Sequence, residues 1–152
     1  MDVFINQNIN KFMKKGEYEN YKILYHITKL EYAKSILKNN FDVKKAKNCA
    51  FGIGINMSDD ISHLKTYYDK KINNTVVVSL VKYNKLLFNE PYYKDMHCEE
   101  SQKYLEKHGY TKPTYLKCPK SYDGFIYNDI YVIRKSSLIH PLFICNYKNL
   151  KN

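Results

Sequence analysis

Short apolar runs of β-type composition alternate with a few stretches of helical spacing along the chain. Lys22–Thr28 (KILYHIT) and Thr75–Val81 (TVVVSLV) are dense in β-branched and aromatic residues, a composition typical of strands. After the first run, apolar residues recur every three or four positions, which predicts a helix over Leu30–Asn40. The N-terminal part therefore begins with a strand followed by a helix.

Polar residues at the ends of the helical stretches predict where the helices begin and end. Thr28, with Glu31 three residues later, has the spacing of a capping box, and Asn39-Asn40 is a stop signal. The residues Ser58-Asp59-Asp60 resemble an N-cap signal for a second helix, from Ile61 to near Lys71. In that helix one face would carry Ile61, Leu64, Lys65 and Tyr68.

The C-terminal half is predicted to contain a helix over Glu99–His108 and three strands. Phe125–Tyr127 and Ile130–Ile133 flank Asn128-Asp129, two residues that tolerate the left-handed conformation of a tight turn. This pattern predicts a β-hairpin. Leu142–Cys145 is expected to be the closing strand.

Few helices among short strands, without regular β–α–β alternation, predict the α+β class. The chain has 152 residues, a length that fits one domain. We expect residues 1–20 to be an N-terminal arm, residues 21–147 to form the domain, and residues 148–152 to be a basic tail.

The net charge of +10 comes almost wholly from lysine, because Arg134 is the one arginine beside 24 lysines. Lysine is a compact point charge without the planar fork that reads base edges, so this surface suits loose attraction to polyanions better than sequence readout. An AT-rich genome that favours Lys, Asn, Ile and Tyr codons would produce the same excess. Composition therefore leaves a nucleic-acid partner open.

The four cysteines and five histidines show no metal-ligand spacing, and we expect free thiols and no bound metal. No apolar run approaches the roughly 20 residues that span a bilayer, and the first 16 residues lack a signal-peptide core. These features predict an intracellular protein of the cytoplasm or nucleus, without a membrane partner. We expect a monomer.

Three segments, taken in order, carry a family resemblance. They are Leu24–Thr28 (LYHIT) with the following Ala33–Phe41, then Phe51–Ser58 (FGIGINMS), then Ser121–Phe143 with its YDG turn. Together they resemble the catalytic domains of poly(ADP-ribose) polymerases and related ADP-ribosyltransferases. The resemblance implies a split antiparallel β-sandwich with a few short helices, and NAD as co-substrate. The chain has no G-x-G-x-x-G or phosphate-loop pattern, which argues against a Rossmann site.

The resemblance assigns binding roles to the first two segments. His26 falls on the histidine that hydrogen-bonds the adenosine ribose, and Ile27 on the residue whose backbone clamps the carboxamide. Thr28 falls on a hydroxyl position near the ribose and pyrophosphate. Gly52 and Gly54 match the turn glycines.

The same comparison shows two departures in the part of the site that holds nicotinamide. Asn56 stands where the family has an aromatic ring that stacks on nicotinamide. Tyr67 or Tyr68 matches a second stacking tyrosine, and either ring would have to hold the nicotinamide alone. The family serine that binds the carboxamide aligns near Leu64, with Ser62 as the closest hydroxyl.

The third segment decides the chemistry that the resemblance implies, with His26, Asn56 and Ile130 as the catalytic positions. Polymer-forming members have Glu where this chain has Ile130, whereas mono-ADP-ribosylating relatives often have Ile, Leu or Tyr. Loss of a positioned acid or base costs ~10²–10⁴ in rate, so single transfer is favoured over chain elongation. Asp129 is first a turn residue and second a substitute acid.

Two functions follow from the resemblance. The first is an NAD-dependent mono-ADP-ribosyltransferase that acts on a protein or nucleic-acid acceptor. The alternative is a catalytically inactive module of the same fold that binds NAD or ADP-ribose. The YHIT opening is also similar to toxins that modify DNA bases and, more distantly, to RNA 2′-phosphotransferases, although the chain lacks a set of arginines for a 2′-phosphate.

Overall fold

A single eight-stranded sheet organises the protein in a computed structural model that describes residues 3–6, 20–45, 54–88, 123–127 and 130–150. The strand order is β1-β8-β4-β2-β3-β7-β6-β5, and all neighbours are antiparallel except β5 and β6. The strands are β1 (Phe4–Ile5), β2 (Asn20–Thr28), β3 (Ile55–Ser58), β4 (Thr75–Tyr83), β5 (Leu86–Phe88), β6 (Gly124–Tyr127), β7 (Ile130–Ile133) and β8 (Ile139–Asn146). The helices are α1 (Leu30–Asn39), α3 (Tyr147–Leu150) and the 3₁₀ helices η2 (Val43–Lys45), η3 (Ile61–Thr66) and η6 (Ser136–Leu138).

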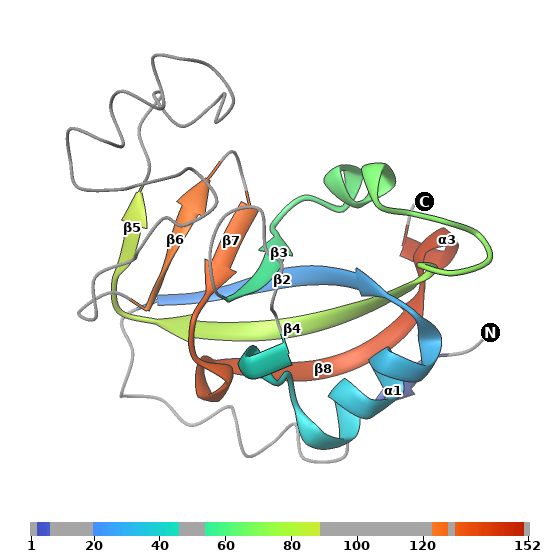
Figure 1. The fold of residues 1–152 in the computed structure, drawn as a ribbon, viewed down its shortest axis with the longest axis horizontal. Coiled ribbons are helices and arrows are strands. Elements are labelled where there is room, and N and C mark those ends of the chain that lie inside the picture. Colours follow the sequence, from blue (N-terminus) through green and yellow to red (C-terminus); the bar gives the residue numbers. More distant parts are fainter. Residues whose placement is uncertain (1–2, 7–19, 46–53, 89–122, 128–129, 151–152) are drawn as a thin grey trace.

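The sheet divides into two halves at the boundary between β2 and β3. In the first half, β2 pairs with β4 over nine register positions, from Asn20–Tyr83 to Thr28–Thr75. In contrast, β2 and β3 share the single register pair Tyr25–Ser58. Strands β3, β7, β6 and β5 stand at a steep angle to β2, β4 and β8 (Figure 1). The two halves therefore diverge on either side of one point of contact.

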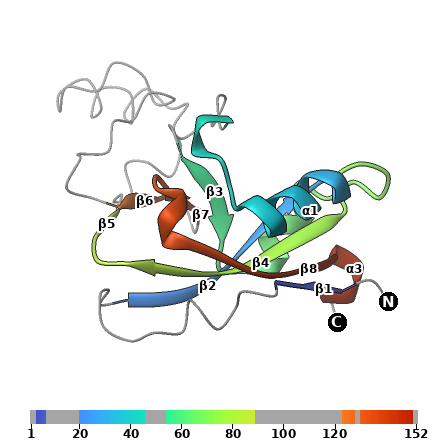
Figure 2. The same ribbon diagram turned by 90° about the horizontal axis from the view of Figure 1, so that it is seen from below.

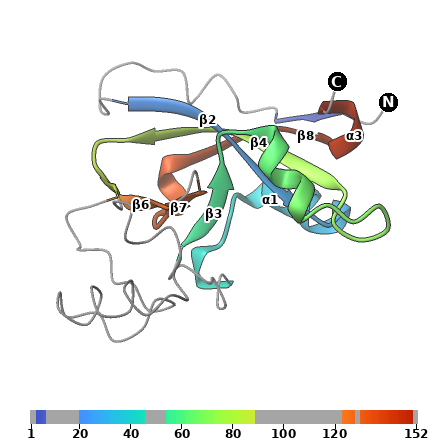
Figure 3. The same ribbon diagram turned by 90° about the horizontal axis from the view of Figure 1, so that it is seen from above.

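The first half of the sheet is covered on both faces. Helix α1 lies against β4 and β8 on one face, where Ala33 packs with Leu24, Val77 and Val81 (Figure 2). On the other face, η3 and α3 cover a second cluster that includes Val78 and the buried Tyr147 (Figure 3). Strand β4 is buried on both faces over most of its length, and its run of valines supplies apolar side chains to both clusters.

The α+β class is confirmed, and most predicted elements are present. Strand β2 contains the predicted strand at Lys22–Thr28, α1 the predicted helix, and β4 the predicted strand at Thr75–Val81. Strands β6 and β7 form the predicted antiparallel hairpin, with Tyr127 opposite Ile130. The predicted helix over Glu99–His108 lies outside the described residues. No helix within those residues is long and apolar enough to cross a membrane.

Two local predictions were wrong. Thr28 does not cap α1, because it is still extended and paired with Thr75, and Lys29 occupies the N-cap without a side-chain hydrogen bond. The second helix is a 3₁₀ helix that ends at Thr66, not an α-helix that reaches Lys71. The Asp69 carboxylate accepts hydrogen bonds from the backbone of Lys71 and Ile72 and forms a turn there. In the predicted arm, Phe4–Ile5 is an edge strand on β8.

Asn40 ends α1 and ties it to the loop before β8. Its φ of 70° lies in the left-handed region, which asparagine tolerates better than most residues. Its side-chain Nδ2 donates to the carbonyls of Ser136 (2.9 Å) and Ile139 (3.0 Å). One residue thus fixes both the end of the helix and its position on the sheet.

We predict that Asn40→Gly lowers the free energy of unfolding by roughly 1–3 kcal/mol, because three side-chain hydrogen bonds are lost: the two donated by Nδ2 and one that Oδ1 accepts from the backbone N–H of Phe41. Asn40→Ala should cost about 1–2 kcal/mol more, because alanine also has to adopt the left-handed conformation. Chemical denaturation of the two variants measures both terms. Equal stability of the glycine and alanine variants would contradict the backbone contribution.

Candidate functional site

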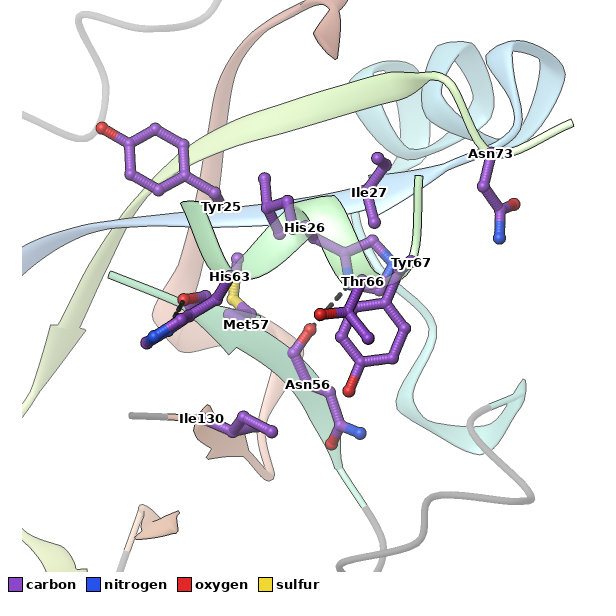
Figure 4. Close-up of a pocket in the computed structure, with 12 residues that line it drawn as sticks. Tyr25, His26, Ile27, Asn56, Met57, His63, Thr66, Tyr67, Asn73 and Ile130 are labelled. Carbon is purple, nitrogen blue, oxygen red and sulfur yellow. Dashed lines mark hydrogen bonds between the residues drawn. The ribbon is translucent and has the colours of Figure 1, made fainter. Parts of the chain in front are cut away.

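A pocket of about 380 Å³ lies where the two halves of the sheet diverge (Figure 4). Strand β2 supplies one wall, β3 and β7 supply a second, and η3 and the turn after it supply a third. The residues that line the pocket are Tyr25, His26, Ile27, Asn56, Met57, Ser58, His63, Leu64, Thr66, Tyr67, Asn73 and Ile130. The pocket is therefore built from four segments that are distant in the sequence.

A side chain bridges the two halves beside the point where the backbone ladder stops. The last pair between β2 and β3 is Tyr25–Ser58. One residue further along β2, His26 Nδ1 lies 2.7 Å from the backbone carbonyl oxygen of Asn56. Because β3 has turned away from β2, this imidazole replaces the backbone pairing that a continuous sheet would have there. The bond holds β3 at the distance that leaves the pocket open.

The hydrogen bond to Asn56 also fixes the chemical state of His26. A carbonyl oxygen only accepts, so Nδ1 carries the proton, and in the neutral ring Nε2 keeps its lone pair. Burial lowers the pKa of His26 below its ordinary value, against the opposing effect of the Asn56 carbonyl. The ring edge also contacts Phe41, with centroids 5.2 Å apart and planes nearly perpendicular. A neutral, oriented imidazole is the result.

The three predicted catalytic positions lie around this pocket: His26 on β2, Asn56 on β3 and Ile130 on β7. Asn56 Oδ1 is buried and has no hydrogen-bond partner among the described residues. Ile130 opposes Ser58 across the ladder of β3 and β7. An aliphatic side chain thus occupies the wall at this position. Asp129, the alternative acid, lies outside the described residues.

The two candidate stacking tyrosines have different environments. Tyr67 lines the pocket and is 54% exposed, so its ring presents a face to a ligand. Tyr68 instead packs against Tyr147 in the hydrophobic cluster beneath η3, with ring centroids 4.7 Å apart. Of the two, Tyr67 is the residue that could stack on a bound ring.

The remaining predicted binding residues contribute in different ways. Ile27 lines the pocket, whereas Thr28 does not. Ser62 is also not among the lining residues, and its hydroxyl donates to Asp60 Oδ1 at 2.7 Å as part of the cap of η3. Gly52 lies outside the described residues.

Gly54 does not line the pocket but directly precedes β3, the strand that carries Asn56. A Cβ at this position would lie 2.6 Å from Val132 Cγ1 and 2.9 Å from the backbone oxygen of Ile133. Glycine therefore allows the start of β3 to approach β7 closely, which positions Asn56 two residues later.

Sequence reasoning did not identify His63, Thr66 and Asn73 as part of the site. The reason is the type of helix: in a 3₁₀ helix, residues three apart eclipse one another, so His63 and Thr66 project together. The α-helical spacing assumed for this segment grouped Leu64 with Tyr68 instead. The predicted helix ended near Lys71, so Asn73 fell outside it. No spacing rule would have placed these residues in one wall.

Charge is absent from the described wall of the pocket. None of its lining residues is Lys, Arg, Asp or Glu, although the whole chain carries +10. Among the described residues no group of three or more His, Cys, Asp or Glu side chains could hold a metal ion. The wall offers aromatic and aliphatic surface with a few hydroxyl, amide and imidazole groups, a composition typical of pockets for neutral organic groups.

A charged cluster lies beside the pocket and also spans the two halves. Lys22 Nζ on β2 lies 3.2 Å from Asp59 Oδ2 and 5.0 Å from the centroid of the Tyr131 ring on β7. The Tyr131 hydroxyl donates to the same Asp59 oxygen at 3.3 Å. These contacts supplement the single backbone pair between β2 and β3.

Comparison of the chain with models of protein families found no match. A search among curated proteins found no significant relative. The fold and the pocket are therefore the basis on which function is considered.

We predict that thermal stability falls as the pH is lowered below about 6.5, the ordinary pKa of histidine. Because the folded-state pKa of His26 is depressed, the unfolded chain binds more protons in acid, and the stability present at higher pH is lost. His140 adds to this effect, since burial also lowers its pKa. The slope should approach about 1.4 kcal/mol per pH unit for each histidine that stays neutral in the folded protein.

Melting temperatures of the wild type, His26→Gln and His140→Gln between pH 7.5 and 5 measure these contributions. Each substitution should flatten the pH dependence by its own share. An unchanged slope in His26→Gln would show that this imidazole is not held neutral.

Proposed function

We propose that the protein is an NAD-dependent mono-ADP-ribosyltransferase of the polymerase-like type, with the nicotinamide and its ribose in the pocket between the two halves of the sheet. The supporting observation is that residues assigned from separate parts of the sequence line one pocket: His26, Ile27, Asn56 and Ile130 from the three segments, and Tyr67 from the helix that follows the second segment. Residues chosen from an unrelated resemblance would have no reason to converge.

The arrangement of the sheet agrees with this proposal. An eight-stranded sheet that separates into two four-stranded halves, in contact at Tyr25–Ser58, has the form expected of a split β-sandwich. The pocket lies at the separation. We therefore assign the finer fold type, the ADP-ribosyltransferase sandwich, as part of the same proposal.

The chemistry of the wall suits NAD. His26 Nε2 can accept a hydrogen bond from a hydroxyl of the adenosine ribose, the group that the resemblance assigns to this histidine, because the Asn56 carbonyl holds the proton on Nδ1. Tyr67 can stack on the nicotinamide ring, which is cationic in NAD and is attracted to an aromatic face. The described wall provides no Lys or Arg for the diphosphate, so the charged part of NAD lies beyond it.

Ile130 limits the reaction to single transfer in this proposal. A carboxylate at this position would hold a ribose hydroxyl and orient it as the next acceptor. An aliphatic side chain cannot accept a hydrogen bond from that hydroxyl. Chain elongation is therefore disfavoured, while cleavage of the nicotinamide bond is still supported by the rest of the pocket.

The same residue favours the second candidate function, a module that binds NAD or ADP-ribose without turnover. The two functions differ in one measurement. A transferase releases nicotinamide from bound NAD, whereas the module binds NAD and releases none.

A polyanionic acceptor is compatible with the charge of +10, and so is a protein acceptor with an acidic surface. The charge gives a way to distinguish them. Binding to nucleic acid should weaken steeply with salt, because counterions are released.

We predict that Tyr67→Ala weakens NAD binding about tenfold or more, because a stacked ring contributes ~1–3 kcal/mol. Tyr67→Phe keeps the ring and should bind as the wild type does. Tyr68→Ala is the matched control: it removes the contact with Tyr147 and should lower the melting temperature with little effect on NAD affinity. Isothermal titration calorimetry measures the affinities. Equal affinity in Tyr67→Ala and wild type would contradict the stacking role.

We also predict that acceptors incubated with the protein and NAD gain one ADP-ribose unit per modified residue. Mass spectrometry of candidate protein and nucleic-acid acceptors detects the adduct. Poly-ADP-ribose chains would contradict the role given to Ile130. Tight NAD binding without any adduct or nicotinamide release would favour the binding module.

A further inference from the structure

Apart from His26, His63 on η3 is the one imidazole among the described lining residues, and an imidazole nitrogen can accept a proton. The described wall also contains the phenols of Tyr25 and Tyr67. His26 Nδ1 donates its proton in a hydrogen bond to the Asn56 carbonyl. In Figure 4, His63 lies with Ile130 on the side of the pocket away from Tyr67, and Asn56 lies between.

A hydrogen-bond chain orients the His63 ring. The Ser58 hydroxyl accepts from the backbone N–H of Asp60 and donates to the Asp60 carbonyl, both at 3.1 Å. The Ser58 oxygen also lies 3.4 Å from His63 Nδ1, and Nδ1 is the donor in this contact when the Ser58 proton is given to the Asp60 carbonyl. In that tautomer the neutral ring has its proton on Nδ1 and its lone pair on Nε2.

A carboxylate lies near that lone pair. Asp60 Oδ2 is 4.0 Å from His63 Nε2, and Asp60 itself is held in place as the cap of η3. The hydroxyl and backbone N–H of Ser62 lower the pKa of Asp60, so this group stays ionised. If Nε2 gains a proton, the imidazolium forms beside a negative charge.

We propose that His63 is the general base of the transferase, in place of the carboxylate that Ile130 lacks. The proposal rests on the proposed function. In the reaction, the bond between ribose C1′ and the nicotinamide nitrogen breaks, and its electron pair leaves with nicotinamide. A nucleophilic oxygen or nitrogen of the acceptor bonds to C1′, and its proton passes to His63 Nε2. The imidazolium then returns the proton to water, so charge and atoms balance.

If His63 is the base, the position of its ring determines the side from which the acceptor enters the pocket. Nicotinamide stacks on Tyr67, so the acceptor enters from the side of His63 and Ile130. A positioned base contributes ~10²–10⁴ in rate. In the absence of another acceptor, water takes the same path, and the protein should hydrolyse NAD slowly.

The test compares nicotinamide release from NAD in His63→Gln and in the wild type, with NAD affinity measured by calorimetry on the same samples. His63→Gln keeps a hydrogen-bonding side chain without a base and should lower kcat at least about 100-fold while the NAD dissociation constant stays within about twofold. His140→Gln, the same change on β8 outside the pocket lining, should leave both values unchanged.

Two further measurements separate a base from a structural role. The kcat of the wild type should fall on acidification, as the imidazole takes up a proton, and this acid limb should disappear in His63→Gln. Imidazole added to His63→Ala should restore part of the rate, which a merely structural residue would not allow. Because His26, Tyr25, Tyr67 and Asp60 also face the pocket or His63, the profiles are compared between variants rather than interpreted alone.

The possible failures are distinct. Unchanged kcat in His63→Gln, or no rescue by imidazole, overturns the assignment of the base and leaves the proposed function intact. NAD binding without nicotinamide release by the wild type overturns the base and favours the binding module. Absence of NAD binding by the wild type overturns the proposed function, and the base with it.

Discussion

The hydrogen bond from His26 Nδ1 to the Asn56 carbonyl is the constraint on which the pocket depends. Two antiparallel strands normally continue to pair, and the valine-rich neighbour β4 holds β2 straight along nine register positions. β3 follows its own partner β7 and leaves β2 after one pair. The imidazole spans the opening. This side-chain bond takes the place of backbone pairing between β2 and β3, and a pocket lies where a continuous sheet would have none.

The same geometry is repeated in the second histidine of the wall. His26 Nδ1 donates to the Asn56 carbonyl, and His63 Nδ1 lies against the Ser58 hydroxyl, so in each ring the proposed role falls to Nε2. The partners differ, and the difference separates the proposed roles. His26 is half-buried against Phe41 and is suited to accept a hydrogen bond from a fixed ligand. His63 is beside an ionised carboxylate and is suited to accept a proton.

The strands were predictable because their signals are local. β-branched density marked β2 and β4, and the residues Asn128-Asp129 between two apolar runs marked the hairpin of β6 and β7. The pocket positions of His26, Tyr67 and Ile130 followed from a resemblance, because no local pattern could relate residues so distant in the chain. Thr28 and His63 show where prediction from local sequence patterns failed. The pairing of Thr28 with Thr75 overrode its capping preference, and three residues per turn in η3 selected a different face from the one that helical periodicity indicated.

The parallel pair β5 and β6 lies at the outer edge of the second half of the sheet, and it brackets the longest stretch of chain between described strands that are consecutive in the sequence. Among the described strands, β7 lies between this pair and β3. The residues that join β5 to β6 connect two strands that carry none of the pocket-lining residues. A change in the length of that connection would therefore leave β2 and β3, and the spacing between His26 and Asn56, as they are.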